Sequence, residues 1–128
     1  MRQDAATMTT RDIPRSEWRS FFDDFSRVHE SWLVQLEEIG RPAGPTAVAA
    51  RGLPLMGLSY DPGDDTVTVA LGGGDDAHVT RIISRPSRVE VQQTDGIDRA
   101  VVVEPRSGPA TRVSFRSVMR PEEVDGVA

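Results

Sequence analysis

Two histidines, His29 and His78, offer the chain its clearest means of acid–base or metal chemistry. His78 follows Asp75 and Asp76 in a glycine-rich stretch, so it could work with either carboxylate as the acid–base pair of a hydrolase or an isomerase. A metal ion would need both histidines, or one histidine together with such carboxylates. Acidic residues beside glycine are also ordinary material for a solvated hairpin. We therefore favour no metal, no cofactor and no catalytic residue, and keep the His78 pair as the enzymatic alternative.

Arginines form the densest basic run of the chain just after His78. Arg81, Arg85 and Arg88 fall within eight residues of one another. A guanidinium group can hold a carboxylate or a phosphate through two parallel hydrogen bonds. We expect an anion-binding or partner-binding site formed by His78, Arg81, Arg85 and Arg88. The alternative is a solvated strand face, on which these arginines pair with Glu90 and neighbouring acids.

The composition excludes several classes of function. All 15 basic residues are arginine, and neither lysine nor cysteine occurs. Without a thiolate there is no disulfide, iron–sulfur cluster or thiolate zinc site, and without lysine there is no Schiff base and no Walker phosphate loop. The net charge of −5 argues against general nucleic-acid binding. No stretch is apolar enough to span a membrane or to serve as a signal peptide, so we expect a cytoplasmic protein.

The sequence predicts a single domain of the α+β class, which would position the histidines and arginines described above. The chain has 128 residues, of which 38% are hydrophobic and 27% are charged, as in globular proteins with a single core. Residues 1–12 are polar and aperiodic and predict a disordered lead-in. We expect the domain to cover 13–118 and a flexible tail to follow over 119–128.

An amphipathic helix is predicted over 15–29. Its apolar stripe consists of five residues at offsets 0, 3, 4, 7 and 10, namely Trp18, Phe21, Phe22, Phe25 and Val28. The next segment fits both the helical period and the strand period, because Trp32, Val34 and Leu36 also alternate with polar residues. We favour a strand over 31–38, since aromatic and β-branched residues suit a sheet.

The remaining chain predicts strands separated by turns rich in Gly, Pro and Asp. Apolar and polar residues alternate cleanly over 66–71, 88–92, 101–104 and 112–116, and more weakly over 46–51, 56–60 and 78–84. We expect a twisted antiparallel sheet of six or seven strands, curled toward a half-barrel, with the helix on its dry face. The two edges of such a sheet leave unpaired backbone groups, and a homodimer would cover them.

Several short motifs resemble those of a family of small bacterial proteins that is classified only as a domain of unknown function. They are Ile13-Pro14-Arg15-Ser16-Glu17-Trp18, Phe25-Ser26-Arg27 with His29-Glu30, and Trp32-Leu33-Val34. The family commonly has Gly where this chain has Ser31, which implies that the helix ends there. It commonly has a second His where this chain has Arg81, which weakens any two-histidine site. The resemblance implies no activity, and we favour a non-enzymatic interaction or ligand-binding module.

Overall fold

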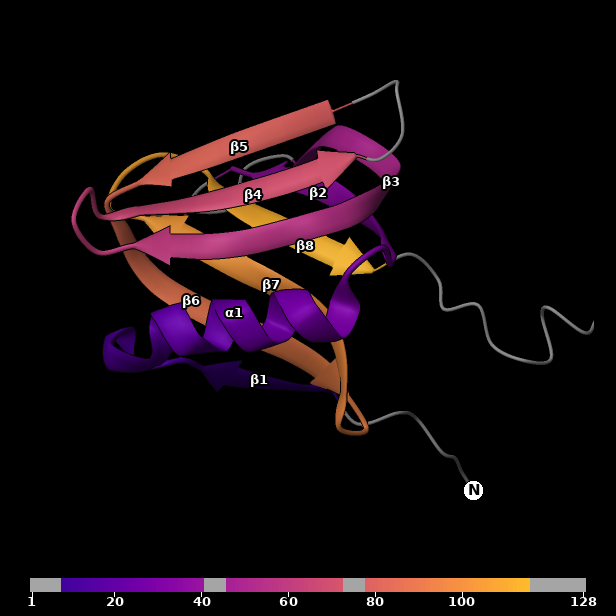
Figure 1. The fold of residues 1–128 in the computed structure, drawn as a ribbon, viewed down its shortest axis with the longest axis horizontal. Helices are drawn as coiled ribbons and strands as arrows, with labels where there is room; N and C mark the ends of the chain where they lie inside the picture. The colour runs from indigo at the N-terminus through magenta and orange to yellow at the C-terminus, as the bar shows by residue number, and fades with distance from the viewer. Residues whose placement is uncertain (1–7, 41–45, 73–77, 116–128) are drawn as a thin grey trace, which may run out of the picture.

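The computed structural model describes residues 8–40, 46–72 and 78–115, which form eight β-strands and one α-helix (Figure 1). The strands are β1 (Met8–Asp12), β2 (Leu33–Ile39), β3 (Thr46–Asp61), β4 (Thr66–Gly72), β5 (His78–Ser84), β6 (Pro86–Thr94), β7 (Ile97–Pro105) and β8 (Ala110–Phe115). A short 3-10 helix, Arg15–Glu17, leads into α1 (Trp18–His29). The expected antiparallel sheet with an N-terminal helix is confirmed, but the sheet has eight strands and not six or seven.

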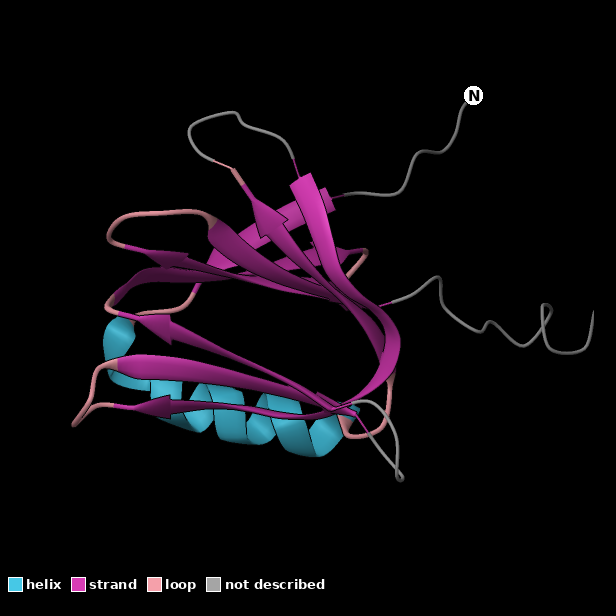
Figure 2. Cartoon of the chain, turned by 90° about the horizontal axis from the view of Figure 1, so that it is seen from above, coloured by secondary structure: helices cyan, strands magenta, loops and turns pink. Residues whose placement is uncertain are grey.

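The sheet folds over on itself to make two layers (Figure 2). Its strands follow the order β1-β6-β7-β8-β2-β3-β4-β5, and every neighbouring pair is antiparallel. The 16-residue strand β3 belongs to both layers, because its first half pairs with β2 and its second half pairs with β4. The end strands β1 and β5 do not pair with each other, so the sheet is bent but not closed.

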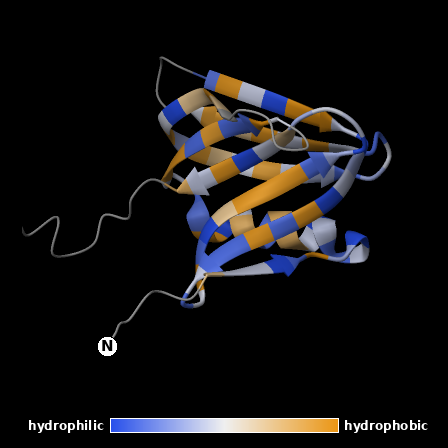
Figure 3. Ribbon diagram, turned by 180° about the vertical axis from the view of Figure 1, so that it is seen from behind, coloured by the Kyte–Doolittle hydropathy of each residue, from blue (hydrophilic) through white to orange (hydrophobic). Residues whose placement is uncertain are grey.

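The core lies between the two layers and α1. Along β4, Val67, Val69 and Leu71 are fully buried and alternate with half-buried residues, while Val101 and Val103 of β7 are buried opposite them. Figure 3 shows this alternation as orange and blue bands along the strands. The prediction that α1 covers the dry face of a single sheet is therefore only partly right. Much of the dry face is covered by the sheet itself, since the bend in β3 turns β4 and β5 back over it.

The helix uses a slightly different face from the predicted one. The buried residues of α1 are Trp18, Phe22, Phe25 and His29. Val28, which the prediction placed in the stripe, has 63% of its surface exposed. The prediction was wrong at this end because, at 3.6 residues per turn, Trp18, Phe22, Phe25 and His29 fall within about 60° of one another around the helix, whereas Val28 lies outside this arc.

A serine attaches α1 to the backbone of β3. The Ser26 hydroxyl donates a hydrogen bond to the Leu58 carbonyl (2.9 Å) and accepts one from the Leu58 N–H (2.8 Å). Figure 1 shows α1 lying beside β3, on the side away from β4. The serine thus satisfies backbone groups of β3 where that strand has left β2, as a neighbouring strand would do.

The helix ends where the family resemblance implies. Ser31 has a φ of 75°, in the left-handed region that glycine adopts most easily. Its N–H donates to the Leu55 carbonyl (2.8 Å), and the Leu55 N–H donates to the Trp32 carbonyl (2.8 Å). These bonds direct the chain from α1 into β2, and the favoured strand over 31–38 is confirmed as Leu33–Ile39.

One strand lies in the expected lead-in. β1 pairs with β6 from Met8 opposite Thr94 to Asp12 opposite Glu90. All five of its residues are exposed, so the strand has no alternation for sequence analysis to detect. Residues 1–7 and the predicted tail over 119–128 lie outside the described residues. Within residues 8–40, 46–72 and 78–115, no helix combines the length and the apolar character that crossing a membrane requires.

A polar cluster fixes the start of the helical segment to the sheet. Arg15 donates hydrogen bonds to the Tyr60 hydroxyl (3.0 Å), to the Asp65 carboxylate (3.1 Å) and to the Pro86 carbonyl (2.7 Å). Its guanidinium also lies 4.2 Å from the ring centre of Trp18. The hydrogen bond that Tyr60 donates, supported by Arg15, lowers the pKa of Asp65 below its ordinary value.

Asp65→Asn should remove an acid-sensitive part of the stability. Because the folded state lowers the pKa of this carboxyl below 3.8, it favours the ionised form. That stabilisation is fully present above the ordinary pKa and is lost as the pH falls through the lowered one. Urea unfolding at about pH 7 and about pH 3 should show a larger advantage of wild type over the variant at the higher pH. An equal difference at both pH values would contradict this role.

Candidate functional site

A pocket of about 320 Å³ opens between the two layers, where β5 faces β2 and the end of the β7–β8 hairpin. Its volume lies in the range of small-ligand sites, and the mouth of a curled sheet is a common place for one. The lining residues are Glu38, Arg81, Ile82, Ile83, Ser84, Pro105, Ser107, Pro109 and Thr111. They come from segments that are far apart in the sequence.

The register of the strands directs two charged side chains into this space. Arg81 of β5 lies opposite Val69 of β4, whose side chain is fully buried. Glu38 of β2 lies opposite Thr111 of β8, and Thr111 in turn lies opposite the buried Val103. Directly opposed residues of an antiparallel pair share one face of the sheet. Arg81 and Glu38 therefore both belong to the inner faces, but of different layers.

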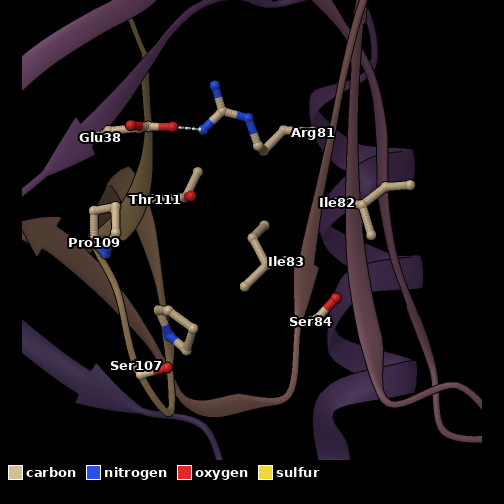
Figure 4. A pocket seen from close by; sticks show the side chains of 9 residues that line it. Glu38, Arg81, Ile82, Ile83, Ser84, Ser107, Pro109 and Thr111 are labelled. Atoms are coloured by element: carbon tan, nitrogen blue, oxygen red, sulfur yellow. Dashed lines mark hydrogen bonds and ion pairs between the residues drawn. The ribbon is translucent and has the colours of Figure 1, made fainter.

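The two charged groups meet in an ion pair across the mouth of the pocket (Figure 4). Nη1 of Arg81 donates a hydrogen bond to Oε2 of Glu38. The side chains keep 27% and 40% of their surface exposed, so solvent and solutes can reach both. A pair with this exposure contributes little to stability, and separating it costs little. It is therefore a polar contact that a ligand can replace.

The walls below the ion pair combine apolar side chains with hydroxyl groups, and the pocket as a whole exposes more polar than apolar surface. In Figure 4, Ile83 points into the pocket while Ile82 and Ser84 point away from it. Ile83 is 5% exposed, and Thr111 places a buried hydroxyl group beneath the ion pair. Pro109 forms part of the opposite wall. This arrangement can bind a small molecule through its charged group at the ion pair, with an apolar contact to Ile83 and a hydroxyl contact to Thr111.

Of the four residues predicted to bind an anion, Arg81 alone lines this pocket. His78 is exposed and lies three positions before Arg81, hence on the opposite face of β5. Arg85 is exposed at the bend between β5 and β6, where its φ is 51°. Arg88 belongs to β6, in the other layer. The structure thus separates residues that the sequence places within a short run, because the chain changes layer at Arg85.

Arg88 takes part in a local network on the outer face of β6. Its Nε lies 3.1 Å from Oδ1 of Asp12, and its Nη2 lies 3.2 Å from Oε2 of Glu90. The hydrogen bond to Asp12 and the charge of Glu90 raise the pKa of the Arg88 guanidinium. For Arg88, this arrangement agrees with the alternative interpretation, in which the arginines lie on a solvated strand face and pair with acidic residues.

His29 belongs to the core and not to the pocket. Its side chain is buried, and its Nδ1 lies 2.9 Å from the Phe25 carbonyl oxygen while its Nε2 lies 3.7 Å from Oδ2 of Asp98. The ring centres of Phe25, Phe115 and Trp32 lie 4.2, 4.7 and 4.7 Å from that of the imidazole. Both ring nitrogens thus face polar groups within an aromatic cluster, as in a structural histidine.

The enzymatic alternative falls partly outside the described residues, since Asp75 and Asp76 lie in the segment 73–77. The part of the chain that the structure describes holds no group of three or more His, Asp or Glu side chains that could bind a metal ion.

Sequence analysis did not identify Glu38, Thr111 or Pro109 as site residues. The alternation in the predicted strand over 31–38 shows that Glu37 and Glu38 point to opposite faces, but not that Glu38 meets Arg81 while Glu37 lies 3.5 Å from Arg112. Which charged side chains meet depends on the register of β2 with β8 and on the position of β5, which lies over both strands. Neither can be obtained from local spacing.

The chain is similar in sequence to one protein family and to a bacterial relative. A family model described as "Family of unknown function (DUF5335)" matches residues 9–124. An "Uncharacterized protein" from Aquifex aeolicus (strain VF5) is 32% identical over 101 residues, which cover 79% of this chain and 86% of the relative. No solved structure matches the chain.

Proposed function

This chain belongs to the family of unknown function DUF5335, and we propose that it is a non-enzymatic binding protein whose pocket between β5 and β2 takes a small ligand with an acidic group. The observation that carries the proposal is the partly exposed ion pair of Arg81 and Glu38 at a cavity into which Ile83 also points. The proposal keeps Arg81 from the predicted anion-binding cluster as its anchor.

Arg81 suits the binding of an acidic group because of its geometry. A guanidinium carries five N–H donors in a planar fork, and the contact with Glu38 involves one of its terminal nitrogens, Nη1. Strand β5 fixes the backbone of Arg81 before a ligand arrives, so that only the side chain has to be ordered on binding. The apolar wall at Ile83 then adds affinity through burial of the ligand body.

The described lining also supports binding over catalysis. It contains an ion pair, hydroxyl groups, two isoleucines and two prolines, and it contains neither of the two histidines. A general acid or base needs a group that exchanges a proton near neutral pH. Arg81 does not do so, the Glu38 carboxylate is paired with it, and we propose that both residues serve recognition.

We expect Arg81→Gln to weaken the binding of an acidic ligand by about tenfold or more, since a hydrogen bond to a charged group is worth about 1.5–3 kcal/mol. The measurement is titration of ¹⁵N-labelled protein with benzoate, succinate, inorganic phosphate and L-leucine, followed by NMR. At least one of these probes should shift the amide signals of Arg81, Ile83 and Thr111.

The control is Arg19→Gln, which removes an exposed guanidinium from the outer face of α1 and should leave binding unchanged. A circular-dichroism melt of both variants verifies folding. The proposal fails if none of the four probes shifts the pocket signals, or if the variant of Arg81 binds like wild type.

We further propose that the protein acts in the cytoplasm. We also propose that it self-associates through its end strands, β1 and β5. β1 and β5 each pair with one neighbour in the described sheet, and β5 carries Ile82 with 60% of its surface exposed on its outer face. An edge strand with exposed apolar groups favours pairing with another strand. Sedimentation velocity at high micromolar concentration should show a dimer, and a monomer there would contradict this part of the proposal.

A further inference from the structure

We infer that the ligand of this pocket is a zwitterion, a small molecule that carries a carboxylate and an ammonium group on neighbouring atoms, as an α-amino acid does. The inference rests on the proposed binding function and adds the chemical class of the ligand. It follows from three features of the pocket: the balance of its charges, the separate origins of the two charged residues, and its walls.

The charges at the mouth are balanced. Arg81 and Glu38 are within hydrogen-bonding distance of each other. A ligand with only an acidic group would gain the attraction of Arg81 but would bring its negative charge close to the Glu38 carboxylate. Like charges at such distances repel, and the pairing lost by Glu38 would not be replaced. A ligand with both charges gives each residue a new partner.

The two residues can separate to admit such a ligand. Arg81 extends from β5 and Glu38 from β2, so that each is held by a different layer. Both side chains are partly exposed and have several rotatable bonds, which allows their charged ends to move while the strands stay in place. A carboxylate on Arg81 and an ammonium group on Glu38 then re-form the bridge between the layers through the ligand.

The walls offer an apolar contact to the remaining part of the ligand. Ile83 points into the space below the ion pair, and Pro109 stands on the opposite side (Figure 4). Thr111 offers a hydroxyl that can donate or accept one hydrogen bond. A zwitterion with a small aliphatic side chain can place its two charges on Arg81 and Glu38 and its side chain against Ile83 and Pro109.

The test compares three probes that share the leucine side chain and differ at their charged ends: L-leucine, N-acetyl-L-leucine, which keeps the acid, and L-leucinamide, which keeps the amine. NMR titration of the wild-type protein should give the tightest binding for leucine, with each of the others weaker by about tenfold or more. Glu38→Gln should weaken leucine binding and leave N-acetyl-leucine binding equal or improved. Arg81→Gln should weaken both.

The outcomes separate this inference from the function on which it rests. If N-acetyl-leucine binds as tightly as leucine, the zwitterion is wrong and acid binding at Arg81 stands. The same holds if benzoate, succinate or phosphate shifts the pocket signals while leucine does not. If none of the probes in either experiment shifts these signals, both the inference and the proposed function are overturned.

Discussion

Phe22→Ala should lower the free energy of unfolding by about 3–5 kcal/mol, the range for removing a buried phenylalanine ring. Phe22 lies in the middle of α1, is fully buried, and its ring centre lies 5.3 Å from that of Phe21. The cavity left by the ring would lie between the helix and the sheet, where strands on both sides limit collapse. Urea unfolding measured by tryptophan fluorescence and circular dichroism gives the difference.

The control for Phe22 is an exposed position on the same helix. Arg19→Ala changes a side chain on the outer face of α1 and should alter the stability by no more than about 0.5 kcal/mol. If the two variants have equal stability, the assignment of the buried face is wrong.

His29→Ala is expected to cost about 2–4 kcal/mol, because it removes a buried ring and its hydrogen bond. The imidazole packs against both Phe25 and Phe115, which also contact each other, and its Nδ1 lies 2.9 Å from the Phe25 carbonyl oxygen. His29→Phe keeps an aromatic ring without the polar contacts and should recover part of the loss. The free energies of unfolding of the two variants measure how much each kind of contact contributes.

His78, the other histidine, serves as the control for His29. His78 is exposed at the start of β5, so His78→Ala should change the stability by no more than about 0.5 kcal/mol. A larger loss for His78→Ala than for His29→Ala would contradict the structural role assigned to His29.

Much of the fold is predictable from the sequence, because it depends on periodicity within single elements. Val67, Val69 and Leu71 alternate with Thr and Ala, and they become the buried face of β4. The segment from Trp18 to Phe25 has the helical period and forms α1. β1 was missed because Met8 to Asp12 carry no such pattern, and their place in the sheet depends on backbone pairing with β6.

The candidate site was predictable only at Arg81. Basic residues close in sequence suggested one cluster, but the change of layer at Arg85 places Arg81 and Arg88 on different surfaces. The partner of Arg81 is Glu38, 43 positions earlier. Contacts of this kind depend on how strands are ordered in the sheet, and local patterns contain no information on that order.

The strand order also constrains how the protein is made on the ribosome. β2 is complete at Ile39, yet one of its two neighbours is β8, which begins at Ala110. β1 likewise cannot pair until β6, which begins at Pro86, has been synthesised. The run from β2 to β5 and the hairpin of β6 and β7 can assemble during synthesis, because in both each strand pairs with the next one along the chain. The layer that joins β6, β7, β8 and β2 can form only after residue 115 has left the exit tunnel. A chain that stops before β8 has emerged would contain seven of the eight described strands. It would still lack the strand that joins β7 to β2, and hence the two parts of the sheet.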